Sequence, residues 1–267
     1  MALDLVSVVV PTYNQAKYIP ACLDRLLLQD YPALEIVVVD DASTDGTSEV
    51  LDAYLRSAKE DAVSFASRWD GREVVRETHP RFPRAREIRV VRNAANLGAT
   101  RAYNAGMSRV RGTYATFVPS DDLPHPTFVS ELVGALDRGA DFAYADMWIV
   151  DDAGRVLREF RLPDYSFDRC FGDWYLCGAA KLFRADLLRS VGLFDERFAV
   201  ANDHELFLRF AMSGARFVHV PRVLYSVRFH GADRQTGQHS AGSTRRMFEE
   251  SIELVERARA SSPPSPS

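Results

Sequence analysis

The sequence predicts an α/β fold in which helices flank a mostly parallel central sheet. Two almost uniformly apolar runs, residues 5–10 and 34–39, are typical of strands that are buried on both faces of such a sheet. After each run, apolar residues recur at helical spacing. Strand–helix–strand order of this kind implies right-handed crossovers and parallel pairing.

Local patterns predict the other elements of the first half. The first helix is predicted from the spacing of Ile19, Cys22, Leu23, Leu26 and Leu27. The polar residues 42–47 could form a hairpin turn, but helical spacing at 50–55 favours a loop that leads into a helix. A more amphipathic strand at 87–92 is expected nearer an edge, followed by a helix from about residue 99 and a strand at 113–118.

Residues 59–86 carry many charges and show no clean period, and they predict a surface insertion that is partly mobile. Arg81, Arg84 and Arg86 could contact an anionic partner, although a solvated charged loop is the simpler interpretation.

The second half predicts further helices and strands around an irregular aromatic segment at 164–175. Packing explains most of these aromatic side chains, and an aromatic surface for a sugar ring is the alternative. The predicted elements are a helix at 128–136, a strand at 142–146, a hairpin at 147–160, a strand at 177–183, a turn at 194–198, a helix from 201, short strands at 217–220 and 223–227, and a final helix.

Composition limits the classes of protein to consider. The chain has 267 residues, 46% of them hydrophobic, and a net charge of −4, which argues against general nucleic-acid binding. Cys22, Cys170 and Cys177 are far apart and indicate neither a disulfide framework nor a zinc site. No apolar run approaches the roughly 20 residues that span a bilayer, and no signal peptide is evident. We expect a cytoplasmic protein, with peripheral attachment at the inner membrane surface and homodimer formation left open, and a disordered tail at 261–267.

Ser120, Asp121 and Asp122 directly follow the strand at 113–118. Two adjacent carboxylates at the end of a buried strand repel each other, and a hard divalent cation would remove that repulsion. Mg²⁺ and Mn²⁺ accept carboxylate oxygen and share their other ligands with substrate phosphates. The pattern favours a metal–diphosphate site, and a solvated loop with a helix cap is the alternative.

Polar residues follow three predicted strands, after Val10, Val39 and Val118. In an open α/β sheet, ligands bind outside the carboxyl ends of the strands. Neither a Gly-x-Gly-x-x-Gly fingerprint nor a Gly-Lys-Ser/Thr phosphate loop is present, so neither a dinucleotide nor an NTPase site is indicated. A carboxylate-held metal could neutralise a diphosphate in place of a glycine loop.

Taken in order, these motifs resemble the inverting family 2 glycosyltransferases. The donor half is carried by VVVPTYN at 8–14, VVDDASTDGT at 38–47, NLGATRAYNAG at 96–106 and SDD at 120–122. The acceptor half is carried by VGLFDERF at 191–198, DHEL at 203–206 and Arg209. The resemblance implies the Rossmann-like GT-A fold in one domain, 1–260, with a nucleotide-binding half (1–122), an acceptor half (123–240) and a small second sheet in the acceptor half.

The resemblance also implies a role for each matching residue. The cofactor is Mn²⁺ or Mg²⁺, held by Asp122 and His230, and Asp203 is the catalytic base. The donor is a UDP- or dTDP-sugar, because Asp41 would accept a hydrogen bond from the base N–H; the acceptor is a glycan, a lipid-linked sugar or a small molecule. Nucleotide-sugar contacts are expected from Pro11, Thr12, Tyr13, Asn14, Asp41, Asn96, Gly98, Arg101, Ser120 and Asp121. Acceptor contacts are expected from Trp174, Cys177, Gly178 and Asn202.

Two departures from the family pattern leave questions open. Asn202 precedes Asp203 where the family usually has Glu, so the pKa of the base and the acceptor preference are open, and the insertion is longer than expected. The competing interpretations are a sugar-1-phosphate nucleotidyltransferase, a glycoside hydrolase and a non-catalytic nucleotide-sugar binder. The first lacks its glycine-rich start, the second leaves the donor-like half unexplained, and retention of Asp122 and Asp203 argues against the third.

Overall fold

The computed structural model describes residues 3–60, 63–69, 74–80, 86–173, 175–229 and 241–261. Its strands are β1 (Val6–Thr12), β2 (Leu34–Asp40), β3 (Val63–Trp69), β4 (Val74–Pro80), β5 (Glu87–Arg92), β6 (Tyr114–Phe117), β7 (Leu123–Pro124), β8 (Phe142–Val150), β9 (Val156–Phe160), β10 (Ala180–Arg184) and β11 (Phe217–Arg228). Its helices are α1 (Ile19–Leu27), α2 (Thr47–Glu60), α3 (Ala99–Met107), α4 (Phe128–Asp137), the π-helix η1 (Asp168–Asp173), α5 (Asp186–Val191), α6 (Asn202–Met212) and α7 (Ala241–Arg259).

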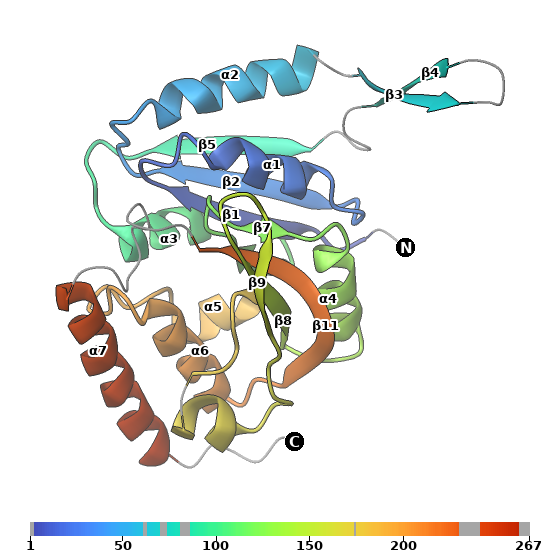
Figure 1. Cartoon of the computed structure of the whole chain (residues 1–267). Coiled ribbons are helices and arrows are strands. Elements are labelled where there is room, and N and C mark those ends of the chain that lie inside the picture. Colours follow the sequence, from blue (N-terminus) through green and yellow to red (C-terminus); the bar gives the residue numbers. More distant parts are fainter. Residues whose placement is uncertain are drawn as a thin grey trace.

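A curled sheet of nine strands forms the centre of the molecule, in the order β5-β2-β1-β6-β10-β8-β11-β7 with β9 on β8 (Figure 1). β5, β2, β1 and β6 are all parallel, as the sequence predicts. β1 lies between two partners, and Val8, Val9 and Val10 have no exposed surface. β5 lies at the edge of the sheet, which confirms the prediction from its amphipathic pattern.

The acceptor half differs from the prediction in its strands. The expected small second sheet is absent from the described part of that half, because β8, β9, β10 and β11 extend the main sheet. The two strands predicted at 217–220 and 223–227 are one strand, β11. Pro221 lies where the register shifts between Val220 and Val223, and such an irregularity is where a strand tolerates a proline.

The second sheet is the antiparallel pair β3–β4, inside residues 59–86, where no regular structure was predicted. Figure 1 shows this hairpin beyond the end of α2, apart from the main sheet. The strands pair from Val63 with Pro80 to Trp69 with Val74. The sequence of residues 59–86 has no clean hydrophobic period, and period-two alternation is the pattern from which a strand is predicted.

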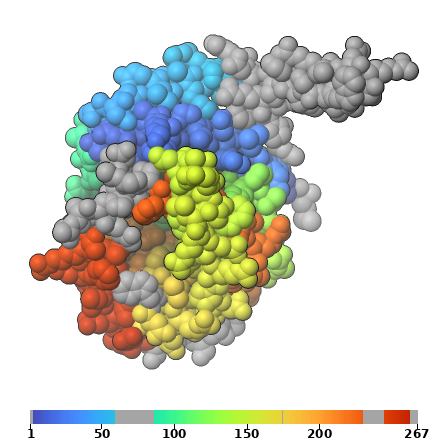
Figure 2. Space-filling view, viewed as in Figure 1, coloured from blue at the N-terminus to red at the C-terminus, as the bar shows by residue number. Residues whose placement is uncertain are grey.

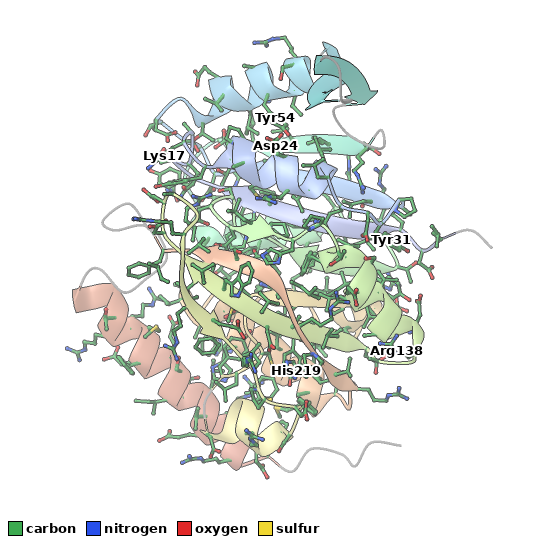
Figure 3. The ribbon with its side chains drawn as sticks, turned by 45° about the vertical axis from the view of Figure 1, so that its right-hand side comes forward. Lys17, Asp24, Tyr31, Tyr54, Arg138 and His219 are labelled. Carbon is green, nitrogen blue, oxygen red and sulfur yellow. The ribbon has the colours of Figure 1, made fainter. Side chains whose placement is uncertain are left out.

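Helices cover both faces of the sheet and enclose two apolar clusters. The first cluster joins α1, α2 and α4 to one face, and the second joins α3, α5, α6 and α7 to the other. All five apolar residues predicted for the first helix are buried in α1. Polar contacts also link neighbouring helices: Tyr54 of α2 donates its hydroxyl to Asp24 of α1 over 2.7 Å (Figure 3).

The predicted hairpin at 147–160 is present as β8 and β9, and its turn reaches the N-terminal half. Lys17 Nζ forms an ion pair of 2.8 Å with Asp152 Oδ2, and the backbone oxygen of Asp152 accepts a hydrogen bond of 2.8 Å from Arg228. Figure 2 shows this yellow-green segment lying across the front of the molecule and against the blue N-terminal residues. The hairpin therefore joins the two halves.

Among the described residues, no helix combines the length and the apolar character that crossing a bilayer requires.

Candidate active site

An open cavity lies at the carboxyl ends of β1, β2 and β6, the edge at which the sequence predicts donor binding. It encloses about 590 Å³, part of it open to solvent. Eight of the ten predicted donor residues line it, and only Asn14 and Arg101 are outside the lining. The lining residues among the ten are Pro11, Thr12, Tyr13, Asp41, Asn96, Gly98, Ser120 and Asp121.

Asp41 shapes one wall of this cavity. Its carboxylate is 2% exposed and accepts hydrogen bonds from the backbone N–H of Gly98 (2.8 Å) and Leu97 (3.0 Å) and from Asn93 Nδ2 (2.7 Å). Gly98 adopts φ +87°, a backbone conformation that glycine reaches without strain. Asp41 therefore fixes the loop before α3, a role that the sequence did not indicate.

The exit of β1 is tied to the loops around it. Asn14, at φ +53°, accepts a hydrogen bond of 2.7 Å at Oδ1 from the Thr44 backbone N–H, so it ties the exit of β1 to the loop after β2. Ser120 donates to Thr12 Oγ1 over 3.0 Å and joins the ends of β6 and β1. Because both hydroxyls are buried, this contact holds the two strand exits at a fixed spacing.

Gln15 lines the cavity and is 6% exposed. Its Oε1 is buried and has no hydrogen-bond partner among the described residues. An unpaired buried acceptor costs about 1–3 kcal/mol.

Arg101 is absent from the lining of the cavity, and its contact with the nucleotide stays a prediction. Arg101 lies in the first turn of α3, on its exposed face, and its side chain forms an ion pair of 2.8 Å with Glu196 Oε2. Both side chains are about half exposed, so the pair is a surface contact between α3 and the 194–198 turn. The helix start was predicted correctly, but the sequence could not show which way this long side chain points.

Asp121 and Asp122 occupy the turn between β6 and β7, and both are buried. Asp122 Oδ2 accepts a hydrogen bond of 3.1 Å from the Tyr225 hydroxyl, and Oδ1 accepts one of 3.0 Å from the Arg228 backbone N–H. The Arg228 guanidinium donates through Nε to the Asp121 backbone oxygen over 3.0 Å. β11 thus holds the acidic turn in place through Tyr225 and Arg228.

The donor chemistry of this turn fits a hard divalent cation. A carboxylate has about four acceptor positions, and Asp122 accepts from the Tyr225 hydroxyl on Oδ2 and from the Arg228 backbone N–H on Oδ1. In the described part of the chain, no three His, Cys, Asp or Glu side chains cluster as a metal cage. Mg²⁺ is commonly bound through one or two carboxylates plus substrate phosphates, which is the arrangement this turn allows. The predicted second ligand, His230, lies outside the described residues.

Asp203 lies in the first turn of α6, as predicted. Its Oδ1 accepts a hydrogen bond of 2.8 Å from the His204 backbone N–H, and its Oδ2 accepts one of 3.3 Å from the Tyr175 hydroxyl. Burial raises the pKa of Asp203 above the ordinary aspartate value, and the Lys181 ammonium is the first of the groups that oppose this rise. A carboxylate with a raised pKa is a better proton acceptor than an ordinary one.

The predicted acceptor residues have mixed outcomes. Cys177 has no exposed surface in this structure, and its acceptor contact stays a prediction. Asn202 donates its side-chain amide to Thr100 Oγ1 over 2.9 Å and links α6 to α3 instead. Gly178 is half-buried at φ +65°, with Leu162 Cδ1 2.7 Å from where a Cβ would lie. Trp174 lies outside the described residues.

Three residues near the donor cavity, the acidic turn or Asp203 were not identified from the sequence. Tyr103 lines the cavity, but its helical spacing indicates only a core position. Arg228 directly follows a predicted strand, and nothing local connects it to Asp121. Lys181 could have been identified from the sequence, because it is the one charged residue inside the apolar strand predicted at 177–183.

Comparisons with known proteins agree with this geometry. The family model described as "Glycosyl transferase family 2" matches residues 7–192. Glycosyltransferase GlyG of Streptococcus pneumoniae is 26% identical over 84% of this chain and 71% of its own length. Chondroitin synthase of Escherichia coli is 26% identical over 85% of this chain and 29% of its own length. Two uncharacterized Rickettsia glycosyltransferases match over 65% of their lengths, so the chain spans about two thirds of several relatives.

Solved structures show the same fold. TarS of S. aureus in complex with UDP-GlcNAc has a TM-score of 0.68 at 23% identity, over 95% of this chain and 66% of that one. A Pyrobaculum calidifontis mannosyltransferase in complex with GDP-Man and Mn²⁺ has a TM-score of 0.60 at 20% identity, over 96% of this chain and 74% of that one.

Proposed function

This chain belongs to glycosyl transferase family 2, and from that premise we propose that it moves a sugar from a UDP- or dTDP-sugar to an acceptor hydroxyl, with Asp203 as general base and with inversion at the anomeric carbon. The observation that carries the proposal is the convergence of eight predicted donor residues on one cavity.

In this proposal the nucleoside lies between Tyr13 and the loop that Asp41 fixes. Tyr13 is half-buried in the cavity wall, so its ring can stack on a base. The carboxylate of Asp41 already accepts three donors from the loop, and a base N–H would add a fourth. Asp121, which lies in the lining farther along the sheet edge, would contact the ribose or the donor sugar.

Asp122 would hold Mn²⁺ or Mg²⁺ together with the donor diphosphate. When bound, the cation supplies positive charge to the departing phosphate. Tyr225 and Arg228 keep the Asp122 carboxylate in one orientation, so little reorganisation is needed when charge develops. A predicted contribution of His230 to the metal site is part of the same proposal.

Asp203 would take the proton of the acceptor hydroxyl as that oxygen attacks the anomeric carbon from the face opposite the diphosphate. One displacement of this kind inverts the configuration, and no enzyme nucleophile is required. The hydrogen bonds from His204 N–H and the Tyr175 hydroxyl orient the carboxylate. Its raised pKa favours proton acceptance while leaving it ionised at a pH above that value.

A thermal-shift screen of nucleotide sugars, with and without Mn²⁺, tests the proposal. A ligand that binds only the folded protein raises the melting temperature, so UDP- or dTDP-sugars should stabilise the protein and Mn²⁺ should increase the effect. NAD is the matched negative control. Stabilisation by NAD and by no nucleotide sugar would overturn the proposal, and binding without any transfer would favour the non-catalytic alternative.

A further inference from the structure

The first turn of α6 carries Asp203, and the residue before that helix cannot cap it. A helix commonly begins at a Ser, Thr, Asp or Asn whose side-chain oxygen accepts one of the unpaired N–H groups. Ala201 occupies this position and makes no side-chain hydrogen bond to the turn. The acceptor comes instead from α7, 49 residues farther along the chain.

Glu250 of α7 provides that acceptor. Its Oε2 accepts hydrogen bonds from the backbone N–H groups of Ala201 (2.8 Å) and Val200 (2.9 Å), and its Oε1 accepts one of 3.1 Å from that of Ala199. The Arg246 guanidinium donates through Nε to Oε1 over 2.6 Å. A carboxylate has about four acceptor positions, so these four donors match its full capacity.

The Glu250 carboxylate is buried and charged. It is 8% exposed, and among the described residues the three N–H groups have no other acceptor. Burial by itself would raise the pKa of Glu250, but the hydrogen bonds from the backbone of 199–201 and from Arg246 outweigh that effect and lower it. Glu250 is therefore ionised at neutral pH, and an anion is favoured at a helix N-terminus.

The segment that Glu250 holds is also fixed by α3. The Thr100 hydroxyl donates to the backbone oxygen of Phe198 over 2.7 Å and accepts a hydrogen bond of 2.9 Å from Asn202 Nδ2. Residues 198–202 are thus tied to α3 and to α7 by polar contacts. Asp203 is the next residue, so these contacts determine where its side chain starts.

α7 is itself firmly docked, against both α6 and η1 (Figure 1). Leu254 has no exposed surface, and Arg259 Nε donates to the backbone oxygen of Gly172 in η1 over 2.6 Å. Tyr175 follows η1 closely in the chain, and its hydroxyl contacts Asp203 Oδ2 over 3.3 Å. α7 therefore supports the two segments that surround the Asp203 carboxylate.

We propose that Glu250 is a positioning residue that holds the first turn of α6, and with it the Asp203 carboxylate, where it can take the acceptor proton; this rests on the proposed role of Asp203 as general base. The effect passes through the backbone. Glu250 fixes the N–H of Ala201, and the Ala201 carbonyl accepts the helical hydrogen bond of 3.0 Å from Glu205 N–H. Misplacing a catalytic group by about 1 Å can cost about 100-fold in rate.

The test compares Glu250→Ala with Glu249→Ala in the intact chain. Glu249 is the neighbouring glutamate of α7, exposed and paired with Arg245, so its loss should leave both measurements unchanged. For Glu250→Ala we expect faster hydrogen–deuterium exchange at residues 199–205. Transfer is followed as UDP release from the UDP-sugar that stabilises the protein most.

In Glu250→Ala the kcat per UDP-binding site should fall about 100-fold, while the KM for the donor stays unchanged because Glu250 is absent from the lining of the donor cavity. Glu250→Gln keeps one acceptor oxygen, so it should recover part of the loss. It also replaces the alanine variant if that variant does not fold.

Unchanged exchange at the start of α6 in a folded Glu250 variant would overturn the inference. Exchange that rises throughout the chain, with a normal kcat per UDP-binding site, would also overturn it, because Glu250 would then serve stability alone. The two proposals fail differently. If Glu250→Ala loosens α6 but Asp203→Asn transfers sugar at the wild-type rate, the general-base role fails and the role of Glu250 in holding α6 stands.

Discussion

The backbone N–H of Gly98 donates a hydrogen bond of 2.8 Å to Asp41 Oδ2 and so joins the end of β2 to the start of α3. This contact builds one wall of the donor cavity from two segments that are 57 residues apart. Replacement of Asp41 by Ala leaves the Leu97 N–H without its acceptor and leaves the Gly98 N–H with Asn96 Oδ1. We expect a loss of about 1–3 kcal/mol in the free energy of unfolding and weaker binding of UDP.

Urea denaturation and calorimetric titration with UDP measure the two effects. Asp41→Asn is the matched control, because it keeps one acceptor oxygen and should lose less. Full UDP affinity in Asp41→Ala would show that the wall does not depend on this carboxylate.

Asp122 and Tyr225 give a prediction about the metal. Asp122→Asn should abolish the additional thermal stabilisation that Mn²⁺ gives in the presence of UDP, because a neutral amide is a poor ligand for a hard cation. Tyr225→Phe removes only the hydroxyl that orients Asp122 and should reduce the Mn²⁺ effect without abolishing it. A Mn²⁺ effect of normal size in Asp122→Asn would place the cation elsewhere.

The ion pair of Arg209 with Glu205 predicts a stability effect remote from the cavity. Glu205 is 1% exposed, and Arg209 contacts it over 2.7 Å. Among the described residues, Arg209→Met leaves the buried Glu205 carboxylate with only the longer 3.4 Å contact to Arg257, so we expect a loss of about 3 kcal/mol in the free energy of unfolding. Arg257→Met should cost less, and chemical denaturation should rank the two variants in that order.

We predict that the Asp203 carboxylate, which transfer requires, lowers the stability of the folded protein at neutral pH. Its pKa is raised in the folded state by burial, so the stability that its neutral form supports is present at low pH. That stability is lost as the pH rises from the ordinary aspartate pKa through the raised one. Asp203→Asn should therefore melt at a higher temperature than the wild type at neutral pH, and the difference should shrink toward acidic pH. Calorimetry that finds the variant less stable at neutral pH would contradict this sign.

Local patterns predicted the elements better than the contacts between them. Helical spacing identified α1, and the acidic turn at Asp121 was located from its place after an apolar strand. The same patterns could not show that Cys177 would be fully buried or that Asn202 would bond to Thr100, because both depend on segments distant in the chain. Two short strands were predicted at 217–220 and 223–227, and only the pairing of β11 with β8 shows one strand continuing through a register shift.

The most direct measurement compares transfer and UDP binding in Asp203→Asn, with the nucleotide sugar that stabilises the protein most as donor. Since Asp203 is absent from the lining of the donor cavity, we predict that UDP affinity is retained with Mn²⁺ present while sugar transfer is abolished. Transfer at the wild-type rate in this variant would show that Asp203 is not the general base, because another group would then have to remove the acceptor proton.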